Sequence, residues 1–129
     1  VPHDLAMDSD GRIFVGDRGN NRVQIFDQDG NFIKEWPQFG RPSGLFIDDN
    51  DMLYVTDSSS ENRGPTGSPN NSSPYAEGVR VASVKDGSVT LFLDDPHENG
   101  SQEGIVVDKA GTIYGSLTAG RALRKYLLR

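Results

Sequence analysis

The chain has 129 residues, of which 34% are hydrophobic and 25% are charged, and its formal net charge at pH 7 is −6. This length suffices for one domain of ordinary size. The acidic balance argues against nucleic acid as a partner, and no apolar run approaches the roughly 18 residues of a membrane span. The lack of cysteine excludes disulfides and thiolate sites. Short apolar runs separated by Gly and Pro favour an all-β fold.

The first 40 residues are expected to form a meander of four antiparallel strands. Asp10-Gly11 and Asp29-Gly30 have the composition of two-residue hairpin turns. A polar loop at 18–21 separates the second strand from the third, and Pro37 then interrupts strand pairing. The predicted strands lie at 4–8, 12–17, 22–27 and 32–36.

The opening pattern occurs three times in register. Residues 41–57 and 101–117 align with the start of the chain at offsets of 40 and 100. In each copy an apolar run ends in Asp, a turn follows, and the next apolar run carries an aromatic at one fixed place. These residues are Asp8, Asp48 and Asp108, with Phe14, Tyr54 and Tyr114 expected in the core. Repetition at this period indicates a stacked or radial repeat fold.

The second and third copies are less regular than the first. Residues 41–100 contain an insertion at 58–77 that is rich in Ser, Asn, Gly and Pro, and we expect it to be mobile. Residues 101–129 lack a fourth, outer strand. The predicted strands lie near 44–48, 52–57, 79–84 and 89–93, and near 104–108, 112–117 and 122–127. A solvated outer strand is expected to carry the basic residues Arg121, Arg124, Lys125 and Arg129.

Repeated four-stranded units joined end to end predict a β-propeller. About three blades are present, at 1–40, 41–100 and 101–129. Three blades cannot close a ring, and open blades leave apolar faces exposed. The chain is therefore expected to be half of a six-bladed ring, completed either by the remainder of a longer parent propeller or by a second copy in a homodimer.

The segment PHDLAMDSDGRIFVGDRGNNRVQIFDQDG resembles the NHL repeat. Within that class the chain is similar to bacterial six-bladed propellers related to peptidyl-α-hydroxyglycine α-amidating lyase, and its ending GRALRKYLLR strengthens the similarity. The resemblance covers nearly the whole chain apart from 58–77. It implies an NHL-type all-β propeller fold.

The resemblance also implies functional residues. In the lyase family, His residues at the openings of inner strands hold an axial zinc ion, an Arg after a second strand assists catalysis, and an Asp after a ligand His belongs to a structural calcium site. His3 matches the metal ligand, Arg18 the catalytic residue, and Asp4 the calcium-site residue. The other two copies carry Ser43 and Glu103 at the His position, and Ser58 and Thr118 at the Arg position.

Strand geometry places the same residues together without reference to a family. The start of one strand and the end of its antiparallel neighbour lie at the same end of a sheet, so His3, Arg18, Glu103 and the 58–77 loop should share one face. Imidazole and carboxylate are both zinc ligands. We expect His3 and Glu103 to bind one divalent ion in the axial channel, with further ligands from elsewhere.

Structural alternatives exist for each of these residues. His3 could be an ordinary surface residue of a polar loop. Glu103 could pair with a neighbouring Arg, and Arg18 with Asp17 or loop carbonyls. Asp4 could hydrogen-bond turn backbone, as could the Asp that ends each repeated run. Trp36 is expected to be a packing anchor and His97 a solvent-exposed residue.

Two functions are consistent with these observations. One is a metal-dependent lyase that acts on α-hydroxyglycine-type peptide ends. The other is a non-catalytic propeller scaffold that binds a protein or peptide on the face carrying the 58–77 loop. Both predict a small molecule or peptide as partner, and neither predicts nucleic acid or membrane.

Overall fold

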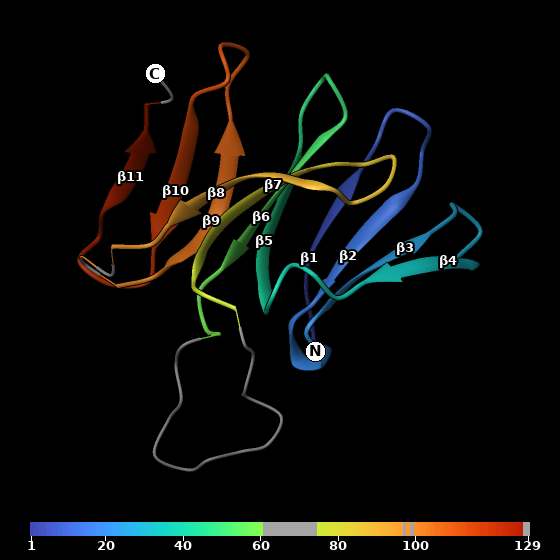
Figure 1. The fold of residues 1–129 in the computed structure, drawn as a ribbon, viewed down its shortest axis with the longest axis horizontal. Helices are drawn as coiled ribbons and strands as arrows, with labels where there is room; N and C mark the ends of the chain where they lie inside the picture. The colour runs from blue at the N-terminus through green and yellow to red at the C-terminus, as the bar shows by residue number, and fades with distance from the viewer. Residues whose placement is uncertain (61–74, 97, 99, 128–129) are drawn as a thin grey trace.

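The computed structural model describes residues 1–60, 75–96, 98 and 100–127. In this part of the chain the strands form three antiparallel sheets, drawn side by side in Figure 1. The strands are β1 (Pro2–Met7), β2 (Ile13–Asp17), β3 (Arg22–Phe26), β4 (Phe32–Trp36), β5 (Pro42–Ile47), β6 (Met52–Asp57), β7 (Gly78–Ser83), β8 (Val89–Asp94), β9 (Gln102–Val107), β10 (Ile113–Leu117) and β11 (Leu123–Tyr126). A short 3-10 turn, η1 (Arg18–Asn20), occupies the expected 18–21 loop.

Each sheet is a meander in chain order, as the repeat pattern predicted. The strand orders are β1-β2-β3-β4, β5-β6-β7-β8 and β9-β10-β11. We call these sheets blade 1, blade 2 and blade 3. The first strands of the blades are innermost, because β1 packs against β5 and β5 packs against β9. The all-β class and the three propeller-type blades are thereby confirmed.

The Asp that ends each first apolar run fixes the hairpin turn after it. Asp48 Oδ1 accepts hydrogen bonds from the backbone N–H groups of Asn50 and Met52, both at 2.9 Å. Asp8 and Asp108 accept the equivalent pairs of bonds in their own blades. The carboxylate thus accepts hydrogen bonds from backbone N–H groups that would lack a backbone acceptor in a tight turn. The turn-forming alternative proposed for these residues is confirmed.

Two apolar clusters lie in the joints between blades. The joint of blades 1 and 2 contains Phe14, Val23, Ile25, Trp36, Phe39, Leu45, Leu53, Val55, Ala82 and Val84. The joint of blades 2 and 3 contains Tyr54, Val79, Val81, Val107 and Ile113. Trp36 is 7% exposed and its ring centroid lies 5.8 Å from that of Phe14 and 6.1 Å from that of Phe39. Its expected role as a packing anchor is confirmed.

Tyr114 departs from the expectation that all three repeated aromatics are core residues. It is only partly buried, with the Lys125 ammonium 5.6 Å from its ring centroid. Phe14 faces blade 2 and Tyr54 faces blade 3, whereas Tyr114 lies on the face of blade 3 that points away from blade 2. No described residue packs a further sheet against that face.

The two outer faces of the three-blade stack are apolar and exposed. On blade 1, Leu5 is 62% exposed, Met7 54% and Phe32 55%. On blade 3, Val106 is 50% exposed and Leu123 68%. The strand register places each set on the face opposite the packed joint. The predicted exposure of unpartnered blade faces is confirmed.

The predicted insertion is packed at both of its ends. Ser58, Ser60 and Glu77 are buried, with exposed fractions of 8%, 0% and 2%. Near the first end, Asp57 Oδ1 accepts the backbone N–H groups of Ser59 and Ser60. The mobility expected for 58–77 stays a prediction. Residues 61–74 lie outside the described residues, as does His97. No helix in the described residues is long and apolar enough to cross a membrane.

Candidate functional site

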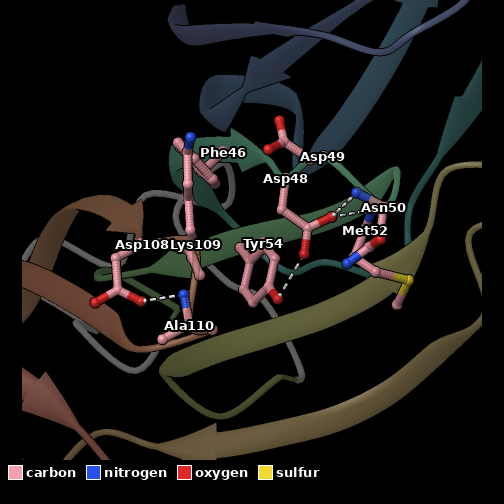
Figure 2. Close-up of a pocket in the computed structure, with 11 residues that line it drawn as sticks. Phe46, Asp48, Asp49, Asn50, Met52, Tyr54, Asp108, Lys109 and Ala110 are labelled. Carbon is pink, nitrogen blue, oxygen red and sulfur yellow. Dashed lines mark hydrogen bonds between the residues drawn. The ribbon is translucent and has the colours of Figure 1, made fainter.

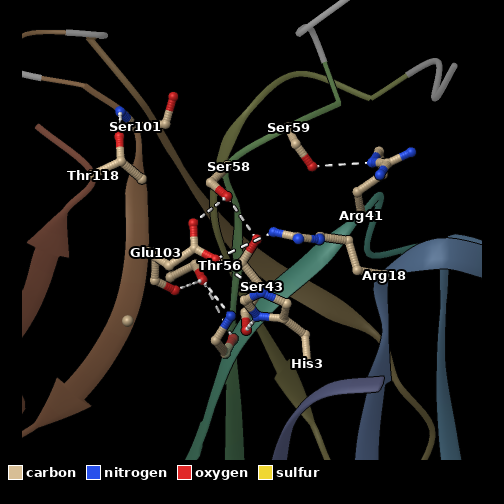
Figure 3. A network of polar contacts seen from close by, with 12 residues as sticks. His3, Arg18, Arg41, Ser43, Thr56, Ser58, Ser59, Ser101, Glu103 and Thr118 are labelled. Carbon is tan, nitrogen blue, oxygen red and sulfur yellow. Dashed lines mark hydrogen bonds and ion pairs between the residues drawn. The ribbon is translucent and has the colours of Figure 1, made fainter. Parts of the chain in front are cut away.

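The inner strands β1 and β9, together with the segments that follow β2 and β6, bring a polar cluster together at one end of the molecule. Glu103, in β9, places Oε1 at 3.2 Å from both Arg18 Nη1 and His3 Nε2. Its other oxygen accepts a hydrogen bond from Ser58 Oγ at 3.0 Å. Figure 3 shows these side chains pointing toward one another. We call them the Glu103 cluster; the expected convergence of its members is confirmed.

A close approach of two inner strands holds the cluster in place. A Cβ added at Gly44 would lie 2.6 Å from the carbonyl oxygen of Glu103, so a side chain there would force β5 away from β9. Thr56 Oγ1 donates to the Glu103 carbonyl at 2.7 Å and accepts from Gly44 N–H at 2.7 Å. These contacts fix the Glu103 backbone. Its carboxylate is free of them and interacts with the neighbouring side chains.

The orientation of the His3 ring is set by a backbone carbonyl. His3 Nδ1 lies 2.8 Å from the carbonyl oxygen of Ser43, which can only accept a hydrogen bond, so Nδ1 carries a proton. Nε2 then faces the Glu103 carboxylate. That contact is favourable when Nε2 also carries a proton or when a cation lies between the two atoms. A backbone-held Nδ1–H is also the arrangement that orients metal-binding histidines.

Arg18 reaches Glu103 because Asp17 is already engaged. Asp17 accepts hydrogen bonds from Asn20 at 2.8 Å and from Arg22 at 2.9 Å. Burial opposes ionisation of this carboxyl, but the hydrogen bonds from Asn20 and Arg22 outweigh it and lower the pKa of Asp17. The alternative that Arg18 pairs with Asp17 is wrong, and the alternative that Glu103 pairs with a neighbouring Arg is confirmed.

The charged members of the cluster are accessible to a ligand. The side chains of His3, Arg18 and Glu103 are 28%, 30% and 34% exposed. Ion pairs with this exposure contribute only about 0–1 kcal/mol to stability. The cluster therefore adds little to the free energy of folding, and its guanidinium, imidazole and carboxylate remain available for recognition.

The described residues supply only part of a metal site. Among them no group of three His, Cys, Asp or Glu side chains could hold a metal ion. His3 and Glu103 offer two ligands, and the Arg18 guanidinium occupies the same carboxylate oxygen as His3. A zinc site requires three or four protein ligands. The zinc ligation predicted for His3 and Glu103, like the catalytic role of Arg18, stays a prediction.

Asp4 lies next to His3 in β1, but its carboxylate serves the backbone. Its two oxygens accept the N–H of Leu5 at 2.9 Å and the N–H of Leu45 at 2.7 Å. The second bond joins β1 to β5 and so links blade 1 to blade 2. The structure thus gives Asp4 a structural contact, and its calcium role stays a prediction.

The sequence pattern did not identify the hydroxyl groups of the site. Ser58 and Thr118 were noted only as departures from Arg18, yet Ser58 donates to Glu103. Ser43 Oγ lies 2.6 Å from Ser58 Oγ and continues the network. A signal was present, because the repeat offset aligns positions 18, 58 and 118, and all three carry hydrogen-bond donors.

Comparison with known proteins agrees with this architecture. Residues 1–26 match the family model of the NHL repeat. Residues 1–26 therefore resemble an NHL repeat, which forms the first part of blade 1. Human NHL repeat-containing protein 3 is 40% identical over 60 residues, covering 43% of this chain and 17% of that protein. Protein lin-41 of Caenorhabditis elegans is 59% identical over 34 residues, covering 26% of this chain and 3% of its own length.

Solved structures resemble the three blades in fold. Virginiamycin B lyase from Staphylococcus aureus superposes with a TM-score of 0.65 at 15% identity, covering 98% of this chain and 41% of the lyase. A catalytically inactive form of that lyase, solved with quinupristin, gives a TM-score of 0.64 at 16% identity, with the same coverage. Such low identities establish the fold alone. The chain spans less than a fifth of its curated relatives and about two fifths of this lyase.

Proposed function

We propose that the chain is part of an NHL-type propeller that binds a peptide or protein segment over the Glu103 cluster, without catalysis. The observation that carries this proposal is the pairing of one carboxylate with a guanidinium and an imidazole from another blade, each about one-third exposed. Glu103 can accept backbone N–H groups of an extended segment. Arg18 and His3 can donate to its carbonyls or to a terminal carboxylate.

The charge pattern also constrains the ligand. Arg18 and His3 already face Glu103 across 3.2 Å, so a ligand that engages the carboxylate releases both donors. A segment with neighbouring donor and acceptor groups can donate to Glu103 and accept from Arg18 and His3 at the same time. The peptide backbone carries such groups in every residue except proline.

A peptide-library experiment tests this proposal. The purified chain is probed against an immobilised positional-scanning library of tetrapeptides, and the best binders are remeasured by isothermal titration calorimetry. We expect Arg18→Gln and Glu103→Gln each to weaken binding about tenfold, which corresponds to the loss of one charge-assisted hydrogen bond.

Asp86→Asn is the matched control, because it also converts a carboxylate to an amide but lies in the β7–β8 turn at the opposite end of blade 2. A library whose binders lose no affinity in Glu103→Gln would contradict the proposal. Equal losses in Asp86→Asn and Glu103→Gln would contradict it as well.

A second candidate function is the metal-dependent lyase activity on α-hydroxyglycine-type peptide ends. The observation that favours it is the Ser43 carbonyl at 2.8 Å from His3 Nδ1, which leaves Nε2 to serve as the ligating atom. In this candidate His3 and Glu103 hold a divalent ion together with ligands from outside the described residues. Arg18 would then contact the substrate, since a cation between His3 and Glu103 competes with its guanidinium.

Zinc titration separates this candidate from the first. After treatment with a chelator, the chain is titrated with Zn²⁺ in a calorimeter. We expect His3→Ala to weaken zinc binding at least about tenfold. His97→Ala, which removes the other histidine of the chain, should leave binding unchanged. Equal zinc affinity in His3→Ala and the parent chain would rule out this site.

A further inference from the structure

A cavity lies at the end of the sheets opposite the Glu103 cluster. It has a volume of about 370 Å³ and is bounded by the β5–β6 turn of blade 2 and the β9–β10 turn of blade 3. Phe46, Met52 and Tyr54 supply apolar surface, and Asp48 hydrogen-bonds the Tyr54 hydroxyl at 3.0 Å. Figure 2 shows Asp48 and Tyr54 side by side in this cavity.

The repeat provides a direct comparison, because the equivalent place in the joint of blades 1 and 2 is filled. Arg12 there donates to Asp8 at 2.8 Å and to the Val84 carbonyl of blade 2 at 2.9 Å. Its guanidinium carbon lies 5.5 Å from the centroid of the Phe14 ring. One side chain thus occupies the joint through a carboxylate, a carbonyl and an aromatic face.

The joint of blades 2 and 3 keeps the carboxylate and the aromatic ring but lacks the cation. The repeat offset places Asp48 at the position of Asp8, Tyr54 at that of Phe14, and Met52 at that of Arg12. Within the described residues no Lys or Arg forms an ion pair with Asp48, whereas Asp8 pairs with Arg12. Asp48 accepts hydrogen bonds from the Tyr54 hydroxyl and from two backbone N–H groups, but none of these donors is charged, so no cation in the described part of the chain balances its carboxylate.

A pair of hydrogen bonds that joins the turns of blades 1 and 2 has no counterpart between blades 2 and 3 in the described residues. Ser9 N–H donates to Asp51 Oδ1 at 2.9 Å, and the Ser9 hydroxyl bonds the other Asp51 oxygen, which ties blade 1 to blade 2. The corresponding residues of the second joint are Asp49 and Gly111. Gly111 has no side chain, and a Cβ placed there would meet nothing within 4 Å. The second joint therefore stays open at this end.

We propose that this cavity binds an alkyl guanidinium group supplied by a ligand, in the way that the first joint binds the guanidinium of Arg12. The ligand's cation pairs with Asp48 and lies against the Tyr54 ring, and its alkyl stem contacts Met52 and Phe46. The cavity lining carries three carboxylates and one ammonium, a formal charge of −2, so a cation is favoured over an anion. Lys109 is the one cationic residue of the lining.

Two compounds test the charge requirement directly. Argininamide carries the guanidinium, and in citrullinamide a neutral urea of the same shape replaces that group while the rest of the molecule is unchanged. Binding of each to the full chain is followed by NMR titration. We expect argininamide to bind at least about tenfold more tightly, because only it can form the charge-assisted bonds to Asp48. Equal affinity of the two compounds, or no binding of argininamide, would overturn the proposal.

Three substitutions test whether argininamide binds in this cavity. Met52→Arg recreates the internal side chain of the first joint and should abolish argininamide binding by occupying the cavity. Asp48→Asn keeps a turn-forming side chain and should weaken binding about tenfold. Lys109→Gln should strengthen it a few-fold by removing the like charge.

Asp27→Asn is the matched control, since Asp27 accepts the same pair of turn hydrogen bonds in the β3–β4 turn, away from the cavity. Unchanged binding in Asp48→Asn, or equal loss in Asp27→Asn, would refute the assignment. The guanidinium could belong to a free small molecule or to an arginine side chain of a peptide. Tighter binding of agmatine than of the peptide Gly-Arg-Gly supports the first source, and the reverse order supports the second.

Discussion

At position 102 a fully buried glutamine stands where the other two copies of the repeat have proline. The side chain of Gln102 is 0% exposed, and neither amide atom has a hydrogen-bond partner among the described residues. It packs directly on Gly115, where an added Cβ would lie 2.1 Å from the amide carbon. Burying an amide without partners costs about 1–3 kcal/mol. Its shape fits the joint of blades 2 and 3, but its polarity does not.

We predict that Gln102→Met raises the free energy of unfolding by roughly 1 kcal/mol, because it keeps the shape and removes the unpaired polar atoms. Urea unfolding followed by circular dichroism measures the change. Gln24→Met, on the partly exposed surface of β3, serves as the control and should have little effect. A loss of stability in Gln102→Met would show that the amide has a partner outside the described residues.

Tyr54 gives the molecule a distinct response to alkaline pH. Burial, together with the hydrogen bond to Asp48, raises the pKa of Tyr54 to about 12 from an ordinary value of 10.0. The folded chain therefore holds a proton that the unfolded chain releases. The resulting stabilisation is present below pH 10, and it is lost as pH rises from 10 toward 12.

We predict a late component near pH 12 in the ultraviolet titration of tyrosinate in the folded chain. Tyr54→Phe should abolish this component and reduce the alkaline loss of stability. Tyr114→Phe, at the equivalent place in blade 3, should retain it. Persistence of the late component in Tyr54→Phe would show that burial of Tyr54 beside Asp48 is not its cause.

At the scale of strands, β4 contributes to the fold mainly through one residue. Trp36 closes the joint of blades 1 and 2, whereas Phe32 on the same strand is 55% exposed. We predict that Trp36→Ala lowers the free energy of unfolding by about 3–5 kcal/mol and that Phe32→Ala lowers it much less. Unfolding is followed by circular dichroism and not by tryptophan fluorescence, because Trp36 is the only tryptophan of the chain and Trp36→Ala removes that signal. Equal losses in both variants would argue against an anchor at Trp36.

The repeat made the strands and their shared ends predictable from the sequence. Asp10-Gly11 and its counterparts fix where each hairpin turns, and this alone determines that His3 and Glu103 lie at one end of the sheets. Such inferences depend only on counting along one chain segment and on antiparallel pairing. They hold whether or not the distance between blades is known.

Contacts across the joints were not predictable in this way. Arg12, Arg18 and Arg124 look alike in the sequence, yet Arg12 fills a joint, Arg18 meets Glu103, and Arg124 pairs with the buried Asp95 at 2.6 Å. The expectation of a solvated outer strand around Arg124 is wrong for this side chain, which is 13% exposed. Partner choice depends on how closely two sheets approach, and the repeat pattern carries no measure of that distance.

At the scale of the whole molecule, blades 1 and 3 each bury one face, and blade 2 between them buries both. Blade 2 packs against neighbours on both sides, through the two apolar clusters. Blades 1 and 3 each leave a face that carries exposed large apolar residues. Contiguous apolar surface of this kind is characteristic of an interface that another part of an assembly covers.

We predict that the isolated 129-residue chain self-associates through these outer faces, with a second copy covering Leu5 on blade 1 and Leu123 on blade 3. Analytical ultracentrifugation over a range of concentrations measures the association. Leu5→Glu and Leu123→Glu should each shift the equilibrium toward monomer, because either places a charge in the buried contact. Asp86→Glu, in the β7–β8 turn away from both faces, should leave it unchanged. A parent chain that stays monomeric at all concentrations would show that copies of this chain do not cover these faces.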